Sequence, residues 1–327
     1  MEVATDSGDS PTMQARYLGR SGIRVAPLAF GGNVFGWTAD EATSFRLLDT
    51  FVDAGFDLID TADMYSNWAP GHVGGESETI IGKWLARTGK RDRVVIATKV
   101  GHDMKEGGKG LSRAHILKSI DLSLARLQTD HVDLYQSHLE DPATPHEETL
   151  AAYAELIKAG KVRAIGASNF KPQTLREALD VSRRLGLPRY ETMQPLYNLY
   201  DRADFETGLG PLCRDEGIGV IPYFALASGF LTGKYKTEAD LAQSARGQGA
   251  KKYLNERGLR ILAALEEVAA GLASTPGNVA VAWLMAQPGI TAPIASGRTL
   301  AQVEELVAAA RLVLDATAMQ TLARASA

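Results

Sequence analysis

Strand-like and helix-like segments alternate along almost the whole of this 327-residue chain, and this order restricts the folds that it can adopt. Short apolar runs followed by longer amphipathic stretches are typical of α/β folds with parallel strands. Candidate strands begin near residues 27, 56, 93, 131, 162, 191, 219 and 289, and helical stretches include 39–54, 76–86, 112–127, 146–159, 172–185 and 299–309. Eight such units over roughly 300 residues predict an α/β fold with a single closed (β/α)8 barrel, the TIM barrel.

A doubly wound open sheet is the structural alternative to a barrel. When such a sheet binds a dinucleotide, it usually carries a Gly-x-Gly-x-x-Gly turn after its first strand. The glycine-rich run at that place in this chain is Gly31-Gly32-Asn33-Val34-Phe35-Gly36, which does not match that pattern. The barrel is therefore the favoured prediction.

The segments that frame the barrel can also be assigned from the sequence. Arg16-Tyr17-Leu18 and Ile23-Arg24-Val25 flank a Gly-Arg-Ser-Gly turn, which predicts an N-terminal β-hairpin. We expect residues 1–14, which are mostly small and polar, to form a flexible tail, and residues 15–327 to form one domain. The stretch 234–252 is polar and contains glycine, so we expect a long irregular loop near the mouth that could act as a lid.

The charge of the chain is nearly balanced, with 35 Lys and Arg against 39 Asp and Glu. This balance argues against a nucleic acid or an anionic membrane as the main partner. No apolar run approaches the length of a membrane span, and the first residues do not resemble a signal peptide, so a cytoplasmic location is expected. Cys213 is the single cysteine and the six histidines are scattered, so neither an internal disulfide nor a metal site is expected. A homo-oligomer is left open.

Ionisable residues follow three of the predicted strands. Asp60, Lys99 and His138 end the runs that begin near residues 56, 93 and 131, and Tyr65 follows the first run by five residues. Because parallel barrel strands converge at one mouth, these four side chains are expected to share a pocket suited to proton transfer. The Lys99 ammonium, with Asp60 as its counterion, would lower the pKa of the Tyr65 phenol, and His138 could donate a hydrogen bond to a substrate oxygen. This set suits carbonyl reduction, and since no side chain supplies hydride, a cofactor is implied.

The stretch from Leu58 to Tyr65 resembles the Asp-Thr-Ala-x-x-Tyr signature of the aldo-keto reductases. Further motifs follow in the order and spacing of that family: Thr98-Lys99-Val100, Tyr135-Gln136-Ser137-His138, Gly166-Ala167-Ser168-Asn169-Phe170 and the run from Ser228 to Tyr235. The resemblance extends from about Tyr17 to Leu314 and is to the bacterial and potassium-channel-β-subunit-like branch. It implies an NADPH-dependent oxidoreductase that interconverts a small-molecule aldehyde or ketone and its alcohol.

The resemblance implies a role for each matching residue. Tyr65 would be the general acid, Asp60 and Lys99 would lower its pKa, and His138 would orient the carbonyl. The residues implied to hold the nicotinamide are Ser168, Asn169 and Gln194 at the carboxamide and Tyr223 stacked on the ring. The residues implied at the diphosphate and adenosine are Leu226, Ser228, Gly229, Lys234, Ser296, Arg298, Gln302 and Glu305. Arg298 beside a helix N-terminus can bind a ribose 2′-phosphate, which favours NADP(H) over NAD.

Mostly apolar side chains are expected around the substrate, and they suit a bulky or apolar carbonyl compound. The candidates for this pocket are Asn33, Phe35, Trp37, Met64, Trp68 and Leu139. The chain departs from the family pattern at Phe224 and Ala225, where Ser-Pro is usual, and at Leu306, where Asn is usual. Both departures remove polar groups and could loosen the hold on the cofactor.

Two other functions are compatible with parts of the pattern. Lys99 on a barrel strand could form a Schiff base, as in an aldolase, although Ser168, Asn169 and Gln194 would then have no role. A nicotinamide-binding, redox-sensing regulatory subunit is the alternative from another class, because the channel-β branch uses this fold in that way. Fold alone does not choose between these functions.

Overall fold

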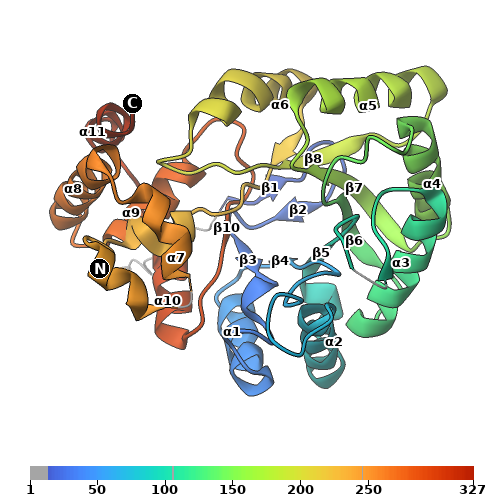
Figure 1. The fold of residues 1–327 in the computed structure, drawn as a ribbon, viewed down its shortest axis with the longest axis horizontal. Coiled ribbons are helices and arrows are strands. Elements are labelled where there is room, and N and C mark those ends of the chain that lie inside the picture. The colour runs from blue at the N-terminus through green and yellow to red at the C-terminus, as the bar shows by residue number, and fades with distance from the viewer. Residues whose placement is uncertain (1–13, 105–106, 245) are drawn as a thin grey trace, which may run out of the picture.

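The computed structural model describes residues 14–104, 107–244 and 246–327. Eight parallel strands form one curled sheet with helices around it, which confirms the predicted (β/α)8 architecture (Figure 1). The strands are β3 (Ala29–Gly31), β4 (Leu58–Asp60), β5 (Val95–Val100), β6 (Val132–Ser137), β7 (Val162–Ser168), β8 (Tyr190–Gln194), β9 (Gly219–Val220) and β10 (Ile294–Ala295).

Hydrogen bonds across the two edges of the sheet close the barrel. Consecutive strands are neighbours from β3 to β9, and β10 pairs with β3. Beside β9, the Thr291 amide donates to the Val220 carbonyl at 2.7 Å and the Ile294 amide donates to the Pro222 carbonyl at 2.8 Å. Because all strands point the same way, their carboxyl ends meet at one mouth.

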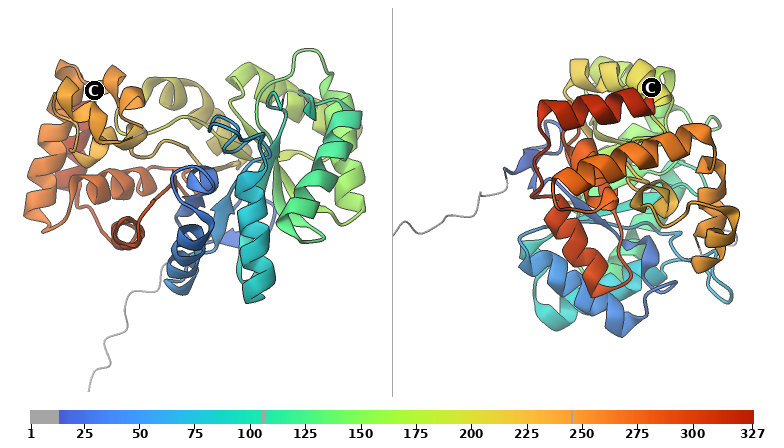
Figure 2. Two further views of the ribbon diagram at one scale, coloured as in Figure 1. Left: turned by 60° about the horizontal axis from the view of Figure 1, so that its bottom comes forward. Right: turned by 90° about the vertical axis from the view of Figure 1, so that its left-hand side faces the viewer.

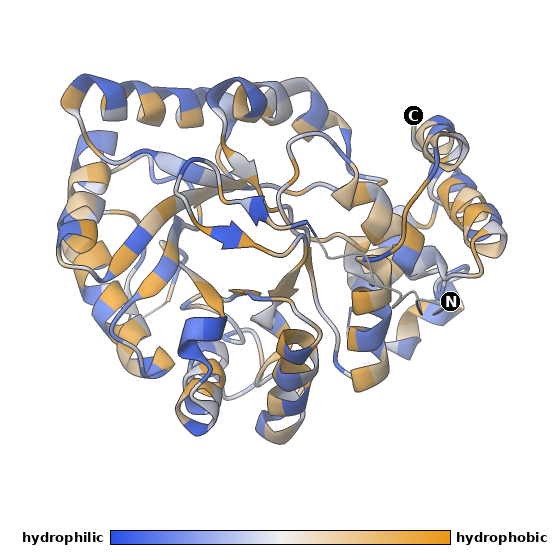
Figure 3. Cartoon of the chain, turned by 180° about the vertical axis from the view of Figure 1, so that it is seen from behind, coloured by the Kyte–Doolittle hydropathy of each residue, from blue (hydrophilic) through white to orange (hydrophobic). Residues whose placement is uncertain are grey.

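The helices cover the outside of the barrel because each has one apolar face. Six of them follow the first six strands: α1 (Glu41–Asp53), α2 (Glu76–Thr88), α3 (Arg113–Leu127), α4 (His146–Lys158), α5 (Pro172–Leu185) and α6 (Gly210–Glu216). Polar side chains fix their starts, as when Asp40 and Ser112 accept hydrogen bonds from backbone amides of α1 and α3. Hydrophobic and hydrophilic residues alternate along these helices with the period of an amphipathic helix (Figure 3).

The last third of the chain adds helices beyond the simple alternation. They are α7 (Gly247–Ala250), α8 (Glu256–Gly271), α9 (Pro276–Met285), α10 (Leu300–Ala309) and α11 (Ala316–Ser326), and they gather on one side of the barrel (Figure 2). Helix α8 packs against both α9 and α11. Among the described residues no single helix is long and apolar enough to cross a membrane, and the pair α8 and α9 reaches that length only with a 95° bend between them.

The predicted hairpin is confirmed and plugs the end of the barrel opposite the mouth. Strands β1 (Arg16–Tyr17) and β2 (Arg24–Val25) pair antiparallel. Leu18, Ile23 and Val25 are buried in one cluster with side chains from inside the barrel, among them Leu58 and Val95. The hairpin therefore completes the interior core and leaves the mouth as the open end.

The prediction of an irregular loop over 234–252 is wrong in its detail. This segment contains short helices at Glu238–Gln243, α7 and Lys251–Tyr253. The first is fixed by a capping box, in which Thr237 and Asp240 bond each other's backbone amides. The tail predicted over residues 1–14 lies outside the described residues, except for Gln14.

Candidate active site

The structure brings Asp60, Tyr65, Lys99 and His138 together at the mouth of the barrel. Lys99 Nζ donates to Asp60 Oδ2 at 2.6 Å, to Tyr65 Oη at 2.7 Å and to the Thr61 carbonyl at 2.9 Å. Three bonds use all three donors of an ammonium group, so Lys99 carries its charge here. Tyr65 Oη in turn donates to Asp60 Oδ2 at 3.2 Å.

The phenol of Tyr65 keeps its proton in this arrangement. Burial and the neighbouring Asp60 carboxylate raise the pKa of Tyr65 well above its usual value, while Arg246 acts in the opposite direction. The predicted effect of Lys99, to lower this pKa, stays a prediction, and the raised pKa here follows from burial and Asp60. Burial also lowers the pKa of Lys99, and Asp60 opposes that effect.

Two glutamines hold the second oxygen of Asp60. Gln194 Nε2 donates to Asp60 Oδ1 at 2.9 Å, and Gln136 Nε2 donates to the same atom at 3.2 Å. The register of the strands explains why these side chains lie close together, since Lys99 lies opposite Gln136 and Ser168 lies opposite Gln194. Gln194, expected at the nicotinamide, therefore also fixes the carboxylate. Gln136 was not predicted as a site residue, although it stands in β6 only two residues before His138.

His138 lies beside Tyr65 as a neutral imidazole. Its ring centroid is 6.2 Å from that of Tyr65 and 5.2 Å from that of His102, a neighbour that sequence reasoning missed. Burial lowers the pKa of His138 well below its usual value, and the charges of Lys99 and His102 add to this effect. A neutral imidazole can still donate one hydrogen bond to an oxygen in the cavity.

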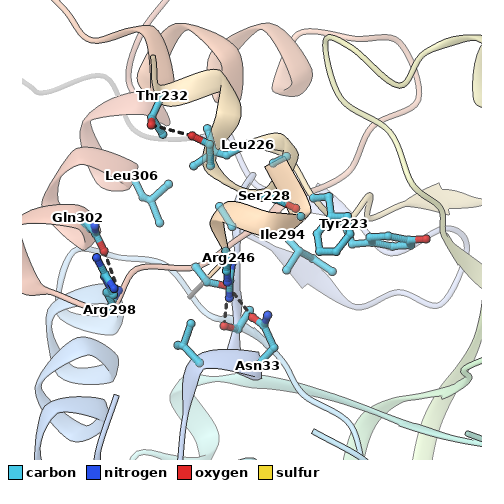
Figure 4. A pocket seen from close by; sticks show the side chains of 18 of the residues that line it. Asn33, Tyr223, Leu226, Ser228, Thr232, Arg246, Ile294, Arg298, Gln302 and Leu306 are labelled. Carbon is cyan, nitrogen blue, oxygen red and sulfur yellow. Dashed lines mark hydrogen bonds between the residues drawn. The ribbon is translucent and has the colours of Figure 1, made fainter. Parts of the chain in front are cut away.

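One cavity of about 980 Å³ extends from the tetrad across the mouth. Every residue predicted to bind cofactor lines it, from Ser168, Asn169 and Tyr223 at one end to Arg298, Gln302 and Glu305 at the other. Figure 4 shows Tyr223 and Arg298 on opposite sides, with Arg246 and Asn33 between them. The Tyr223 hydroxyl donates to Asn169 Oδ1 at 2.7 Å, which links the loop after β9 to the end of β7.

Three cations line this cavity without a carboxylate partner. Among the described residues no Asp or Glu forms an ion pair with Lys234, Arg246 or Arg298. Burial lowers the pKa of Arg246, and the charge of Arg298 adds to this effect. Cations that have no carboxylate partner among the described residues favour an anionic ligand with several charged groups.

Arg246 is the cavity residue that sequence reasoning missed most clearly. The orientation of the Asn33 amide that satisfies both its polar atoms lets Asn33 accept from Arg246 Nη2 at 2.8 Å and donate to Ser296 Oγ at 2.8 Å. The Arg246 guanidinium also lies 5.6 Å from the Trp37 ring centroid. Arg246 stands in the polar segment 234–252, where the sequence offers many charged residues and no motif to single it out.

The loop after β9 is held in a strained conformation beside the cavity. Phe224, Ala227 and Ser228 all have positive φ angles, of 57°, 47° and 58°. A left-handed conformation costs an ordinary residue about 1–2 kcal/mol, so the surroundings must enforce it. At Gly229, with φ 88°, an added Cβ would lie 3.0 Å from Lys234 Nζ, so glycine leaves this cation room.

Two helix N-termini face the cavity. Thr275, Pro276, Gly277 and Asn278 at the start of α9 line it, as does Gln302 in the first turn of α10. The N-terminal end of a helix carries partial positive charge and free amide donors, and so favours phosphate groups. The contribution of α9 was not predicted, because its start carries no charged residue.

The predicted substrate residues divide into two groups. Trp37, Trp68 and Asn33 line the cavity, and the two indole rings meet edge to face with centroids 5.6 Å apart. The prediction for Phe35 is wrong: its ring is fully buried and stacks on Phe30 in the core. Met64 and Leu139 are partly exposed and are not among the residues that line the cavity.

The position of Lys99 argues against Schiff-base chemistry. Its side chain is fully buried and its ammonium is bonded to Asp60, Tyr65 and Thr61. A Schiff base requires a neutral amine that a carbonyl carbon can reach. Neither condition is met here.

The closed barrel, the hairpin plug and the Asp–Tyr–Lys–His cluster at the mouth together define a class of reductases. The model of the Aldo/keto reductase family matches residues 27–327, and the chain belongs to this family.

Curated relatives are similar over nearly the full chain. The oxidoreductase YrpG of Bacillus subtilis (strain 168) is 36% identical over 318 residues, covering 95% of each chain. A probable voltage-gated potassium channel subunit beta of Arabidopsis thaliana is 34% identical and covers 90% of each chain. L-glyceraldehyde 3-phosphate reductase of Escherichia coli (strain K12) is 32% identical over 91% of this chain and 87% of that protein. The branch named from the sequence motifs is thus confirmed.

Proposed function

We propose that this oxidoreductase uses NADP(H) to interconvert an aldehyde or ketone and the corresponding alcohol, with Tyr65 as the general acid and base. The observation that carries the proposal is the cluster in which Lys99 Nζ lies 2.7 Å from Tyr65 Oη and 2.6 Å from Asp60 Oδ2, beside a cavity lined by unpaired cations. The cluster can donate a proton to a substrate oxygen or accept one from it, and the cations can bind the phosphate groups of a cofactor.

The residues of the cavity fit a dinucleotide phosphate. Lys234, Arg246 and the start of α9 can hold a diphosphate, and Arg298 at the start of α10 can hold a 2′-phosphate. Ser168 and Asn169 offer a hydroxyl and an amide to a carboxamide, and Tyr223 offers an aromatic face. When bound, the nicotinamide would supply or accept the hydride.

The protein's own part is to position the carbonyl and to move a proton at its oxygen. In reduction, Tyr65 Oη gives its proton to the oxygen as negative charge develops there, and the Lys99 ammonium stabilises the phenolate that remains. The neutral His138 donates a hydrogen bond to the same oxygen. Trp37 and Trp68 give the cavity an aromatic wall beside Tyr65, against which an apolar part of the substrate can pack.

Replacing Tyr65 by Phe tests the proposal directly. Tyr65→Phe removes the transferred proton and leaves the ring packing, so we expect turnover of a carbonyl panel to fall by at least about 10²-fold. NADPH binding, followed by cofactor fluorescence, should change little. Tyr17→Phe, which removes the hydroxyl of an exposed tyrosine in the hairpin and leaves the cavity unchanged, serves as the matched control. Retention of most of the rate by Tyr65→Phe would contradict the assignment of the acid.

The similarity to plant potassium-channel β subunits supports a second candidate, a cofactor-binding regulatory subunit. Such a subunit would bind NADPH through the same cavity and turn over slowly. The intact hydrogen-bonded tetrad supports the enzyme as the first candidate, because it provides the proton donor that carbonyl reduction requires. Tight NADPH binding with no turnover across aldehydes, ketones and quinones would favour the subunit instead.

A further inference from the structure

A third carboxyl group is buried near Lys99 of the tetrad and has no place in the chemistry described above. Asp63 stands two residues before Tyr65, and its backbone amide donates to the Lys99 carbonyl at 3.3 Å. Its side chain is buried, and Oδ1 has no hydrogen-bond partner within the described residues. An ionised carboxylate in such a place is costly unless a cation pairs with it.

The cations nearby are already paired. Lys99 is bonded to Asp60 at 2.6 Å, and Arg126 Nε of α3 is bonded to Glu78 Oε2 of α2 at 2.7 Å. Glu78 also accepts a hydrogen bond from Thr98, the residue before Lys99. Two cations therefore face three carboxyl groups, and the cluster is electrically neutral only when the third, Asp63, carries a proton.

The carboxyl groups and the ammonium of this cluster are buried, while the Arg126 side chain is 24% exposed. At Gly74, which has a φ of 101°, an added Cβ would lie 3.0 Å from the Asp63 carbonyl oxygen, and at Gly75 it would lie 2.5 Å from Arg126 Cδ. The two glycines thus let the chain close over Asp63 and Arg126. The other groups that act on Asp63 or respond to it come from four elements: Glu78 on α2, Lys99 on β5, Tyr135 on β6 and Tyr153 on α4.

We propose that Asp63 is a positioning residue that is protonated at neutral pH and, on losing its proton to solvent at alkaline pH, opposes the negative charge that Tyr65 must take up. This inference rests on the proposed function of Tyr65. Burial, and after it the charge of Glu78, raise the pKa of Asp63 to about 8, which places the change within reach of experiment. Ionised Asp63 makes Tyr65 a weaker acid, so carbonyl reduction slows as pH rises.

The pH dependence of kcat for carbonyl reduction tests this coupling. The wild type should lose rate between about pH 7 and pH 9, whereas Asp63→Asn, which keeps the shape and cannot ionise, should stay level over that range when scaled to its own rate at pH 7. Glu78→Gln removes the charge that holds the proton on Asp63, so its loss of rate should begin at lower pH. Asp57→Asn, which alters a half-buried carboxyl at the far end of the barrel, should keep the wild-type profile. Superimposable profiles for wild type and Asp63→Asn would overturn the proposal.

Two spectroscopic readouts need no turnover and so separate this inference from the proposed function. The infrared carbonyl band of a protonated carboxyl should be present in the wild type at pH 6.5 and absent from Asp63→Asn. The tyrosinate ultraviolet signal of Tyr65, taken as the difference from Tyr65→Phe, should appear at lower pH in Asp63→Asn than in the wild type. Absence of the infrared difference, or an unmoved Tyr65 signal, would overturn the inference even if the protein proves to be a reductase.

Discussion

Single cationic residues determine how the cavity can bind a negatively charged ligand. Lys234 and Arg246 lie along its middle, while Arg298 is exposed at the rim, where its backbone amide donates to Gln302 Oε1 at 2.9 Å. The Arg298 side chain is free of ion pairs with the described residues, and the start of α10 adds its partial charge at the same place. At this scale Arg298 is the residue best placed to distinguish a cofactor with a 2′-phosphate from one without.

Arg298→Ala should therefore weaken NADPH binding far more than NADH binding. Loss of charge-assisted hydrogen bonds to one phosphate is worth roughly 1.5–3 kcal/mol, so the Kd for NADPH should rise about 10- to 100-fold. Fluorescence titration with both cofactors measures the change. Arg311→Ala, an exposed arginine beyond the other end of α10, is the control. Equal losses of affinity for NADPH and NADH would show that Arg298 does not bind the 2′-phosphate.

At the scale of elements, the hairpin of β1 and β2 contributes stability and not chemistry. Leu18, Ile23 and Val25 fill the end of the barrel away from the tetrad, and the Leu18 amide donates to the Ile23 carbonyl at 3.0 Å to close the turn. The site, in contrast, is built from the carboxyl ends of the barrel strands, the loop after β9 and the starts of α9 and α10. The two ends of the barrel should respond differently to substitution.

Leu18→Ala should destabilise the protein by about 2–5 kcal/mol, because it leaves a cavity in a fully buried cluster. Urea denaturation measures the loss, and turnover per folded molecule at low temperature should stay near that of the wild type. Val313→Ala, at a side chain that is 83% exposed, should change the free energy of unfolding by less than about 0.5 kcal/mol. If Leu18→Ala lowered the free energy of unfolding by as little as Val313→Ala, the hairpin would not be sealing the barrel.

The whole molecule responds to pH through groups whose ionisation differs between the folded and unfolded chain. The pKa of Asp63 is raised from 3.8 to about 8 by folding, so the folded state holds a proton that the unfolded chain releases. Its contribution to stability is complete below pH 4 and is lost as pH rises towards 8. A carboxylate in an ion pair behaves in the opposite way, because its contribution to stability is lost as pH falls.

Asp63→Asn should therefore flatten the alkaline loss of stability. At about 1.4 kcal/mol per pH unit, the wild type should lose up to about 3 kcal/mol more than the variant between pH 6 and pH 8. Urea denaturation of both proteins across this range gives the difference. Parallel curves would show that Asp63 is ionised in the folded protein throughout.

The sequence by itself determined the barrel, the hairpin and the tetrad, because periodic apolar runs and residues at strand ends are local features. It could not place Phe35, whose ring turns into the core against Phe30, or Arg246, which reaches the cavity from a segment without a motif. The charge balance around Asp63 likewise involves β4, β5, α2 and α3, which meet only when the barrel closes. Burial and pairing depend on those distant neighbours, so the ionisation of Tyr65 and Asp63 was decided by the tertiary structure alone.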